Sequence, residues 1–265
     1  RRIEAELGVT LFVRDRTKVV PTAAALQIAK EGMPLVLKAE ALTQSIINQG
    51  TDVAYHVRIG LSQFYGHHML GKTLKSFQQI EPSWEFHVVE GESHFLEQQI
   101  CDGLVDVGLF PTPIYSQDLE SYPVLDEQIL LAISVENKKA IDIADSLMTS
   151  DGIRKIAPFG AFPFILLREG LKLRTLVNRL CQAESFVPKA VIGSETLDSC
   201  RSLVEDDYGI TFLPSTLNSK GDNDKVKFYP LASKLCFRQL VLVARSDRVK
   251  RFHLSEVAHI MQQFL

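Results

Sequence analysis

Two hydroxyl side chains in this sequence occupy positions where a parallel α/β sheet presents free backbone N–H groups to a ligand. Ser62 follows the alternating run 57–61, which predicts a strand, so Ser62 marks that strand's carboxyl end. Thr196 follows Ser194, which we expect to cap a helix, so Thr196 falls in that helix's first turn. The first N–H groups of a helix lack a partner within it and favour an anionic group such as a carboxylate. The two positions predict a small-molecule site; local capping of the backbone by the same hydroxyls is the alternative.

Residues near the ends of other predicted strands extend this site. The segment 62–65 is interpreted as a loop that leads from the first strand towards a helix, and Pro111 ends a strand at 106–110. The segment 158–164 contains three Phe residues and precedes another strand. Its rings would line an apolar pocket or, alternatively, seal a core. The expected ligand contacts are Ser62, Gln63, Phe64, Tyr65, Phe110, Thr112, Phe159 and Thr196.

The sequence shows none of the patterns that carry catalysis or metal binding. No G-x-S-x-G, P-loop or H-E-x-x-H motif and no pair of catalytic carboxylates is present, so we expect no enzyme activity and no catalytic residue. The 4 Cys are isolated, without a C-x-x-C pair or clustered His. Neither a metal site, a disulfide framework nor a cofactor is therefore expected, and His67 and His68 are interpreted as solvated loop residues.

Strand and helix signals alternate through 57–265 and predict an α/β fold with a parallel sheet. Strands are expected at 57–61, 84–89, 106–110, 119–125, 128–135, 164–167, 188–192, 209–214, 226–231 and 237–244. Helices are expected after His68, from Ser93, around 173–180, at 194–205 and at 249–265. A strand at 237–244 that returns to the first sheet would join two subdomains by two crossings. Ligands of such folds bind in the crevice at the carboxyl ends of the strands.

The stretch 22–49 predicts one long amphipathic helix with an apolar seam. The seam residues recur in alternating steps of three and four: Ala25, Ile28, Gly32, Leu35, Ala39, Leu42 and Ile46. Such a seam over about three heptads is typical of a coiled coil. Thr22 is the expected N-cap, 48–50 the expected stop, and Pro34 is expected to kink the helix. We interpret the helix as a dimerisation element; a surface helix packed on its own domain is the alternative.

Size and composition suit an ordinary globular chain of two domains. Of 265 residues, 46% are hydrophobic and 23% are charged. No apolar run reaches the ~18 residues of a membrane-spanning helix, and no secretory signal is visible, so no membrane association is expected. Isolated thiols favour a reducing compartment, and we expect a cytoplasmic protein.

The first 21 residues have the layout of a helix followed by a basic hairpin. Gly8 predicts the end of a helix, and 11–13 and 19–20 predict short extended pieces around a turn. Residues 1–50 hold 7 Lys and Arg against 5 Asp and Glu, although the whole chain has a net charge of −3. A winged helix-turn-helix has this layout, and its wing contacts the phosphates or the minor groove of double-stranded DNA. From charge alone, a solvated basic turn is the alternative.

Motifs in three separated parts of the chain resemble the LysR-type transcriptional regulators. Residues 3–14, together with 20–22, are similar to the end of that family's DNA-binding domain, which passes through an LG-x-x-LF-x-R wing into a linker helix. Residues 102–109 are similar to the family's x-G-x-x-D-x-x-I strand entry, and 203–214 to its lV-x-x-G-x-G-I-x-x-LP signature.

Three residues, in two places, depart from the family's patterns. Ala25 stands in the linker helix where the family usually has Gly, and Asp207-Tyr208 stands where pairs that contain Gly are common. The resemblance nevertheless extends over essentially the whole chain.

The resemblance implies a division of the chain into parts. These are the end of a winged helix-turn-helix domain (1–21), a linker helix for dimerisation (22–50) and a type 2 periplasmic-binding-protein-like effector domain (51–265). Within the last, subdomain I would comprise 57–135 and 237–265, and subdomain II 136–236.

The same resemblance assigns functional residues and partners. Most of the helix-turn-helix would precede Arg1, so the remaining candidates for DNA contact are Arg1, Arg2, Arg14 and Arg16. The family commonly contacts its effector through hydroxyl side chains, here carried over to Ser62 and Thr196. Its members usually assemble as homodimers or homotetramers.

The resulting interpretation is a DNA-binding transcription regulator whose activity is controlled by a small-molecule effector bound between two α/β subdomains. A solute-binding receptor with the same body fold is the alternative, disfavoured by the wing and the linker helix. The peroxide-sensing branch of the family needs a close cysteine pair in subdomain II. Cys181 and Cys200 fall on separate predicted helices, which argues against that branch.

Overall fold

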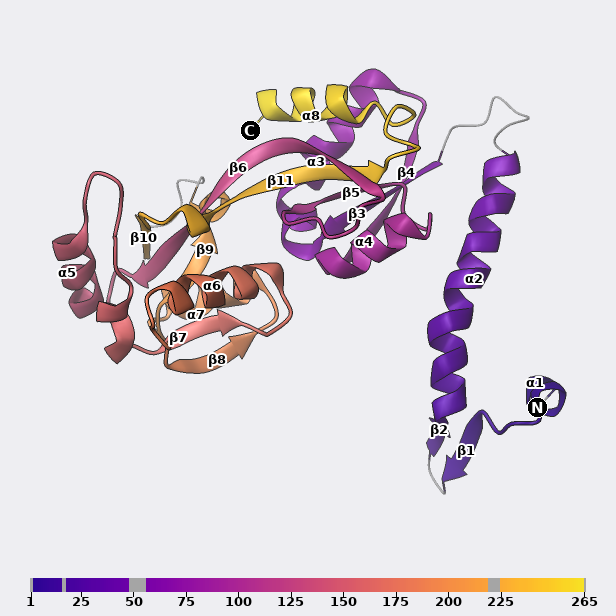
Figure 1. Ribbon diagram of the computed structural model, residues 1–265, viewed down its shortest axis with the longest axis horizontal. Coiled ribbons are helices and arrows are strands. Elements are labelled where there is room, and N and C mark those ends of the chain that lie inside the picture. Colours follow the sequence, from indigo (N-terminus) through magenta and orange to yellow (C-terminus); the bar gives the residue numbers. More distant parts are fainter. Residues whose placement is uncertain (1, 16–17, 48–55, 219–224, 265) are drawn as a thin grey trace.

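The computed structural model describes residues 2–15, 18–47, 56–218 and 225–264 (Figure 1). At the N-terminal end, the helix α1 (Arg2–Leu7) precedes the antiparallel strands β1 (Phe12–Asp15) and β2 (Lys18–Pro21). Gly8 has a φ of +68°, a left-handed conformation that glycine tolerates, and it ends α1 as predicted. The predicted helix and hairpin are confirmed.

The predicted long helix is α2 (Ala23–Ile47), which continues through Pro34 without a break. Thr22 caps it as predicted, because its Oγ1 accepts a hydrogen bond from the backbone N of Ala25 at 3.3 Å. The seam residues Leu35 and Leu42 are 68% and 62% exposed, and α2 stands apart from the α/β body (Figure 1). A helix packed on its own domain therefore does not describe α2. The expected stop at 48–50 lies outside the described residues.

Parallel strands and their connecting helices build the first lobe of the body. β3 (His56–Ser62) lies between β4 (Glu85–Gly91) and β5 (Val107–Pro111), and the connections are α3 (Gln63–Ile80) and α4 (Ser93–Cys101). Ser62 pairs with Gly91, so β3 and β4 end at the same edge of the sheet. The strand–helix order is the predicted one. We call this unit, together with α8 (Leu254–Gln263), lobe I.

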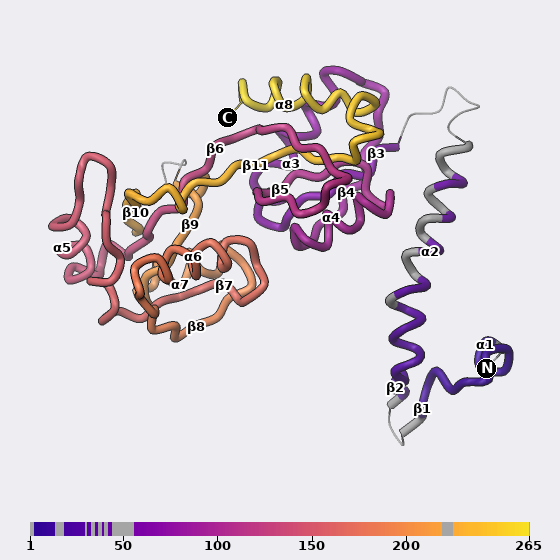
Figure 2. Tube along the Cα trace, viewed as in Figure 1, coloured from indigo at the N-terminus to yellow at the C-terminus, as the bar shows by residue number. Residues whose placement is uncertain are grey.

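The strands β6 (Leu119–Ser134) and β11 (Phe237–Arg245) run from lobe I to the other half of the body (Figures 1 and 2). β11 pairs antiparallel with β5 and β6, so it returns to the first sheet as predicted. β6 is one strand of 16 residues, and the expectation of two strands on either side of 126–127 was wrong. The ladder continues through that point because Glu127 pairs with Arg238.

The remaining elements form lobe II. Its strands are β7 (Phe164–Leu167) and β8 (Ala190–Ser194), which are parallel, and β9 (Thr211–Pro214) and β10 (Val226–Pro230), which pair with β6. Its helices are α5 (Lys138–Leu147), α6 (Lys172–Ala183), α7 (Leu197–Glu205) and the short 3₁₀ turns η1 (Ala157–Ala161), η2 (Ser215–Leu217) and η3 (Lys234–Cys236). The sequence analysis missed α5, although Asn137 caps it by accepting a hydrogen bond from the N of Ala140.

The C-terminal helix is shorter than predicted. We expected a helix from 249, but α8 begins at Leu254 because His253 has a φ of +50°, which interrupts the right-handed helix. α8 contacts α3 and β6 and covers lobe I.

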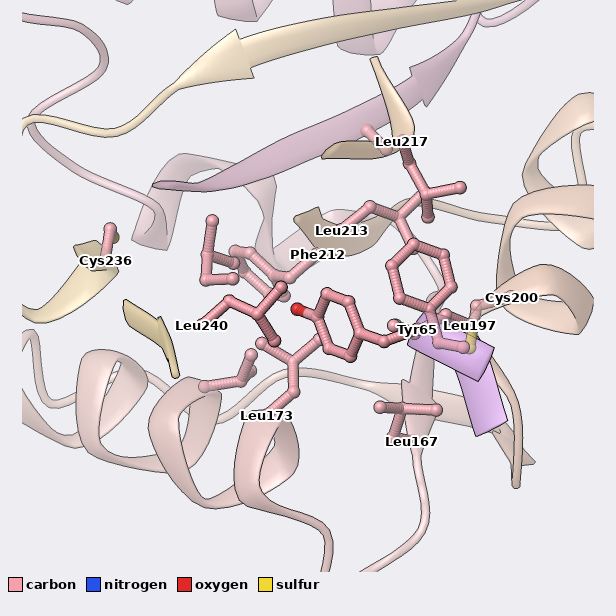
Figure 3. Packing of buried hydrophobic residues seen from close by; sticks show 14 of the residues in the cluster. Tyr65, Leu167, Leu173, Leu197, Cys200, Phe212, Leu213, Leu217, Cys236 and Leu240 are labelled. Atoms are coloured by element: carbon pink, nitrogen blue, oxygen red, sulfur yellow. The ribbon is translucent and has the colours of Figure 1, made fainter. Parts of the chain in front are cut away.

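A continuous apolar cluster joins the two lobes (Figure 3). Tyr65 from α3 lies among Leu173 of α6, Phe212 of β9 and Leu240 of β11. Burial of side chains of this size contributes roughly 1.5–3 kcal/mol each to stability. The cluster therefore holds the two lobes together.

Candidate functional site

A cleft of about 580 Å³ lies between the carboxyl ends of the parallel strands of the two lobes. On one wall, β3 ends at Ser62 and β4 at Gly91; on the other, β7 ends at Leu167 and Thr196 follows the end of β8. The volume is in the range of small-molecule pockets, about 300–1,000 Å³. The structure thus has the crevice that the order of strands predicts.

The N-terminal ends of α3, α4, α6 and α7 lie along this cleft. Their N-cap residues, all of which line it, are Ser62, Glu92, Leu171 and Thr196. Among the described residues, no side chain caps α3, α4 or α6. The positive ends of these helices therefore favour negative charge in the cleft.

The predicted contacts on the cleft are Ser62, Gln63, Phe64, Tyr65 and Thr196. They do not lie as expected, however. The segment 62–65 is not a loop, because Gln63 begins α3 directly after β3. As a result Phe64 and Tyr65 point into the packed first turn of α3 and are only 8% and 2% exposed.

The two predicted hydroxyl contacts differ in their availability to a ligand. Thr196, not Ser194, is the N-cap of α7: its Oγ1 accepts a hydrogen bond from the N of Ser199 at 3.2 Å and donates to the Oγ of Ser199 at 2.8 Å. Ser194 Oγ instead accepts from the N of Thr196 at 3.3 Å. The hydroxyl of Ser62 has no hydrogen-bond partner among the described residues. Ser62 is therefore the hydroxyl that is free to bind.

Phe110, Thr112 and Phe159 do not line the cleft. Phe110 is fully buried in an apolar cluster of lobe I, and Phe159 is fully buried in the core of lobe II. Of the two interpretations of the aromatic segment 158–164, sealing of a core is the one that holds for Phe159. Thr112 Oγ1 accepts a hydrogen bond from the N of Gln239 at 3.0 Å and lines a separate groove.

A buried polar network that the sequence analysis missed forms the base of the cleft. Glu127 is fully buried, and its Oε2 accepts hydrogen bonds from Tyr65 Oη and Arg238 Nε, both at 2.6 Å. Arg238 Nη2 donates to Tyr65 Oη at 3.0 Å, and Thr216 Oγ1 donates to Glu127 Oε1 at 2.7 Å. Tyr65 and Arg238 also line the cleft, so the network connects it to both lobes.

The surroundings in this network keep Tyr65 protonated and Arg238 charged. Burial raises the pKa of Tyr65 well above its usual value, so its hydroxyl remains a donor. Burial opposes the charge of Arg238, but the attraction of Glu127 and Tyr65 more than offsets it and raises the pKa of the guanidinium. In the sequence, the signal for this network is the pair of acidic residues at 126–127, which lies between two apolar strand patterns.

Two ion pairs and one histidine–carboxylate contact connect the walls of the cleft. Lys172 of α6 donates to Glu97 Oε1 of α4 at 2.7 Å and to the backbone O of Pro111 at 3.0 Å. Arg168, which follows β7, pairs with Glu92, and His68 Nε2 lies 3.3 Å from Asp198 Oδ1. The Lys172–Glu97 pair is buried, with side chains 8% and 7% exposed, whereas the other pairs are partly exposed.

The expected DNA contacts lie largely beyond the described atoms. Arg1 and Arg16 lie outside the described residues; Arg2 belongs to α1 and Arg14 to β1, but their side chains are not described. In the part of the chain that the structure describes, no group of three or more His, Cys, Asp and Glu side chains is arranged to hold a metal ion. Within the same residues, no helix combines the length and apolarity needed to cross a bilayer.

Comparison with known proteins connects this architecture with one family. The family described as the LysR substrate binding domain matches residues 50–265. An uncharacterized HTH-type transcriptional regulator of Bacillus subtilis, YcgK, is 26% identical over 257 residues, which cover 94% of this chain and 79% of that protein. The DNA-binding transcriptional dual regulator OxyR of Escherichia coli is 23% identical over 267 residues, covering 99% of this chain and 83% of OxyR.

Solved structures share the fold. A Corynebacterium glutamicum OxyR C206 mutant superposes with a TM-score of 0.61 at 20% identity, covering 99% of this chain and 80% of that one. The effector binding domain of a BenM variant superposes with a TM-score of 0.65 at 14% identity, covering 78% of this chain and 93% of that one.

Proposed function

Because the chain belongs to the LysR-type transcriptional regulators, we propose that a small-molecule effector bound in the cleft between lobes I and II controls its binding to double-stranded DNA. The observation that carries this proposal is the cleft of about 580 Å³ at the carboxyl ends of two parallel sheets, within the residues that match the family. A protein that binds chromosomal DNA acts in the cytoplasm, which is the location we propose. An enzymatic role has no support from the motifs of the sequence.

The cleft favours an anionic effector. Ser62 offers a free hydroxyl at the N-terminal end of α3. The uncapped N-terminal end of α4 lies on the same wall, in lobe I, and that of α6 lies on the opposite wall, in lobe II. Arg238 lies at the base, where a guanidinium binds a carboxylate well. Thr196 contributes the capped end of α7 rather than a free hydroxyl.

Effector binding would be transmitted through the placement of the lobes. A ligand shifts the equilibrium between two relative placements of the lobes only if it binds one placement more tightly than the other. The groups that the effector would contact lie on both walls of the cleft, so its affinity would depend on the placement. Through a homodimer or homotetramer, in which α2 pairs with its copy, such a shift would change the spacing of the DNA-binding ends. The basic hairpin β1–β2, with Arg14 and Arg16, would contact the DNA backbone.

A thermal-shift screen of the chain with small carboxylates tests the proposed cleft. An effector present at 100 times its dissociation constant should stabilise the protein by about 2.7 kcal/mol. Ser62→Ala should weaken the affinity for that effector, with Thr196→Ala as a comparison. Unchanged affinity in both variants would place the effector elsewhere.

DNase footprinting of the protein on promoter DNA tests the regulatory role. A footprint that changes when the effector is added supports a transcription regulator. A solute-binding receptor of the same fold, the alternative, would bind the ligand and leave no footprint.

A relative described as the hydrogen peroxide-inducible genes activator of Haemophilus influenzae, 24% identical over 259 residues, suggests peroxide as a second candidate signal. A thiol reacts with peroxide as its thiolate, so a sensing cysteine needs a low pKa and exposure. Burial raises the pKa of Cys181 to about 11 and that of Cys236 to about 12, and it raises the pKa of Cys200 as well. All are buried. These properties favour a bound effector over thiol oxidation, and peroxide activation abolished by Cys181→Ser would contradict that view.

A further inference from the structure

A second cavity, of about 280 Å³, adjoins the base of the effector cleft. One side is a face of α6 formed by residues three and four positions apart, which include Lys172, Leu176 and Arg179. The other side combines the segment after β5 with η3 and the start of β11. Lys172 and Arg238 line both cavities. The second cavity, which we call the α6 groove, is thus separate from the cleft but shares two of its cations.

The α6 groove is lined by two cations paired with carboxylates outside it, Lys172 with Glu97 and Arg238 with Glu127, and by two further cations, Arg179 and Lys234. Its charged residues are Lys172, Arg179, Lys234 and Arg238, and among the described residues that line it there is no Asp or Glu. Arg179 and Lys234 are exposed and form no ion pair within the described part of the chain. In a chain with a net charge of −3, such a concentration of positive charge favours an anionic occupant.

Arg238 has, in addition, a buried N–H donor that indicates an anion. It is 8% exposed, and its Nε and Nη2 are bonded to Glu127 and Tyr65. Its Nη1 has no acceptor among the described residues, although a guanidinium has five N–H donors to satisfy. A carboxylate would satisfy such a buried donor.

The rest of the lining is aromatic and aliphatic. Tyr115 and Phe237 line the groove although they are 66% and 57% exposed, and Leu176 and Leu235 lie on it as well. Exposed rings beside cations suit a flat ligand that carries a negative charge. An apolar cavity of about 150 Å³ holds one benzene ring, so the α6 groove has room for a bicyclic ring system.

We propose that the α6 groove is a second binding site, which takes a small aromatic carboxylate. Arg238 Nη1 donates to the carboxylate, the exposed Arg179 and Lys234 add positive charge around it, and Tyr115 and Phe237 pack against the ring. The site goes beyond the effector cleft, and its existence does not depend on the effector's identity.

Calorimetric titration of the full chain with 2-naphthoate tests this site. The double variant Arg179→Gln/Lys234→Gln should weaken 2-naphthoate binding at least tenfold. The matched control Lys75→Gln/Lys139→Gln removes the same charge from exposed lysines of α3 and α5 that line neither cavity, and it should bind like the wild type. The neutral isostere 2-naphthalenemethanol should bind at least tenfold more weakly than 2-naphthoate.

Methyl NMR distinguishes the α6 groove from the cleft. Titration with 2-naphthoate should shift the methyl signals of Leu176 and Leu235, and it should still do so in Ser62→Trp, which fills the cleft wall. No binding of 2-naphthoate, equal weakening in both double variants, or loss of the shifts in Ser62→Trp would each overturn the proposal.

Discussion

Glu127 and Arg238 face each other on the two strands that connect the lobes. They are register partners on β6 and β11, and Arg238 Nε donates to Glu127 Oε2 at 2.6 Å with both side chains buried. The same carboxylate accepts from Tyr65 of α3 and Thr216 of η2. A ligand that reaches Arg238 in the cleft thus contacts a network that involves both lobes and both connecting strands.

The first prediction concerns this ion pair. Glu127→Gln leaves the guanidinium of Arg238 buried without its counter-charge, so we expect the free energy of unfolding to fall by about 3 kcal/mol. Urea denaturation measures the change. Asp126→Asn is the control, because it makes the same chemical change one residue away on an exposed side chain that accepts a hydrogen bond from Gln239 Nε2. It should cost less than about 1 kcal/mol; equal losses in the two variants would show that burial of Glu127 is not the cause.

The same pair shows why the sequence predicted most of the fold but not the site's base. The alternation of apolar and polar residues predicted nearly every strand, because one face of each strand must be buried. It failed at 126–127, where charged residues interrupted the pattern and suggested a gap between strands. The partner that makes a buried Glu127 acceptable is 111 residues away along the chain, and no local signal specifies it.

Local capping limits what the sequence predicts at the cleft. Ser194 and Thr196 are both good N-cap residues, and only the backbone geometry decides between them. The reason for a glycine at position 209 likewise depends on a contact between distant segments: a Cβ there would lie 2.5 Å from the backbone O of Pro163. The aromatic residues Phe110 and Phe159 were misplaced because a ring near a strand end packs in a core as readily as in a pocket.

Thr196 offers a second prediction, on the stability of lobe II. Thr196→Ala removes the hydrogen bond from the N of Ser199, so we expect a loss of about 1 kcal/mol in the free energy of unfolding. Thr196→Ser keeps the hydroxyl and should stay within about 0.5 kcal/mol of the wild type. Equal stability of the Ala and Ser variants would mean that the cap does not stabilise α7.

A third prediction concerns the buried contact between the lobes, Lys172–Glu97. Lys172→Met leaves the Glu97 carboxylate buried, with the N of Tyr115 as its remaining donor among the described residues, so we expect a loss of roughly 2–3 kcal/mol. Glu97→Gln alone should also destabilise. The double variant should lose less than the sum, by about 1–3 kcal/mol, in a double-mutant cycle measured by urea denaturation. Strict additivity would indicate that the two groups do not interact in solution.

The exposed seam of α2 supports a fourth prediction, on assembly. Leu35→Asp places a charge in the centre of the seam and should shift the proposed homodimer or homotetramer to smaller species in sedimentation velocity. Gln27→Asp introduces the same side chain two residues after Ala25, away from the seam, and should leave the sedimentation coefficient unchanged. A Leu35→Asp protein that sediments like the wild type would exclude α2 as the main association surface.

The buried thiol of Cys181 makes stability depend on pH in a defined direction. Its pKa is about 11 in the folded protein, against 9.0 for an unperturbed thiol, because burial disfavours the thiolate. Below pH 9 both folded and unfolded chains keep the proton, and the contribution to stability is fully present. Between pH 9 and 11 the unfolded chain loses the proton while the folded chain keeps it, so the free energy of unfolding falls as the pH rises.

The size of this alkaline loss follows from the pKa shift: two pH units at 1.36 kcal/mol each correspond to roughly 2–3 kcal/mol. Cys181→Ala should remove that part of the alkaline loss, measured by urea denaturation at pH 8 and pH 11. Val177→Ala, a buried truncation on the same helix, should lower stability by a similar amount at both pH values and leave the alkaline loss unchanged. If Cys181→Ala and the wild type lose equal stability between pH 8 and 11, the thiol ionises as readily in the folded protein as in the unfolded one, and Cys181 becomes a candidate for peroxide sensing.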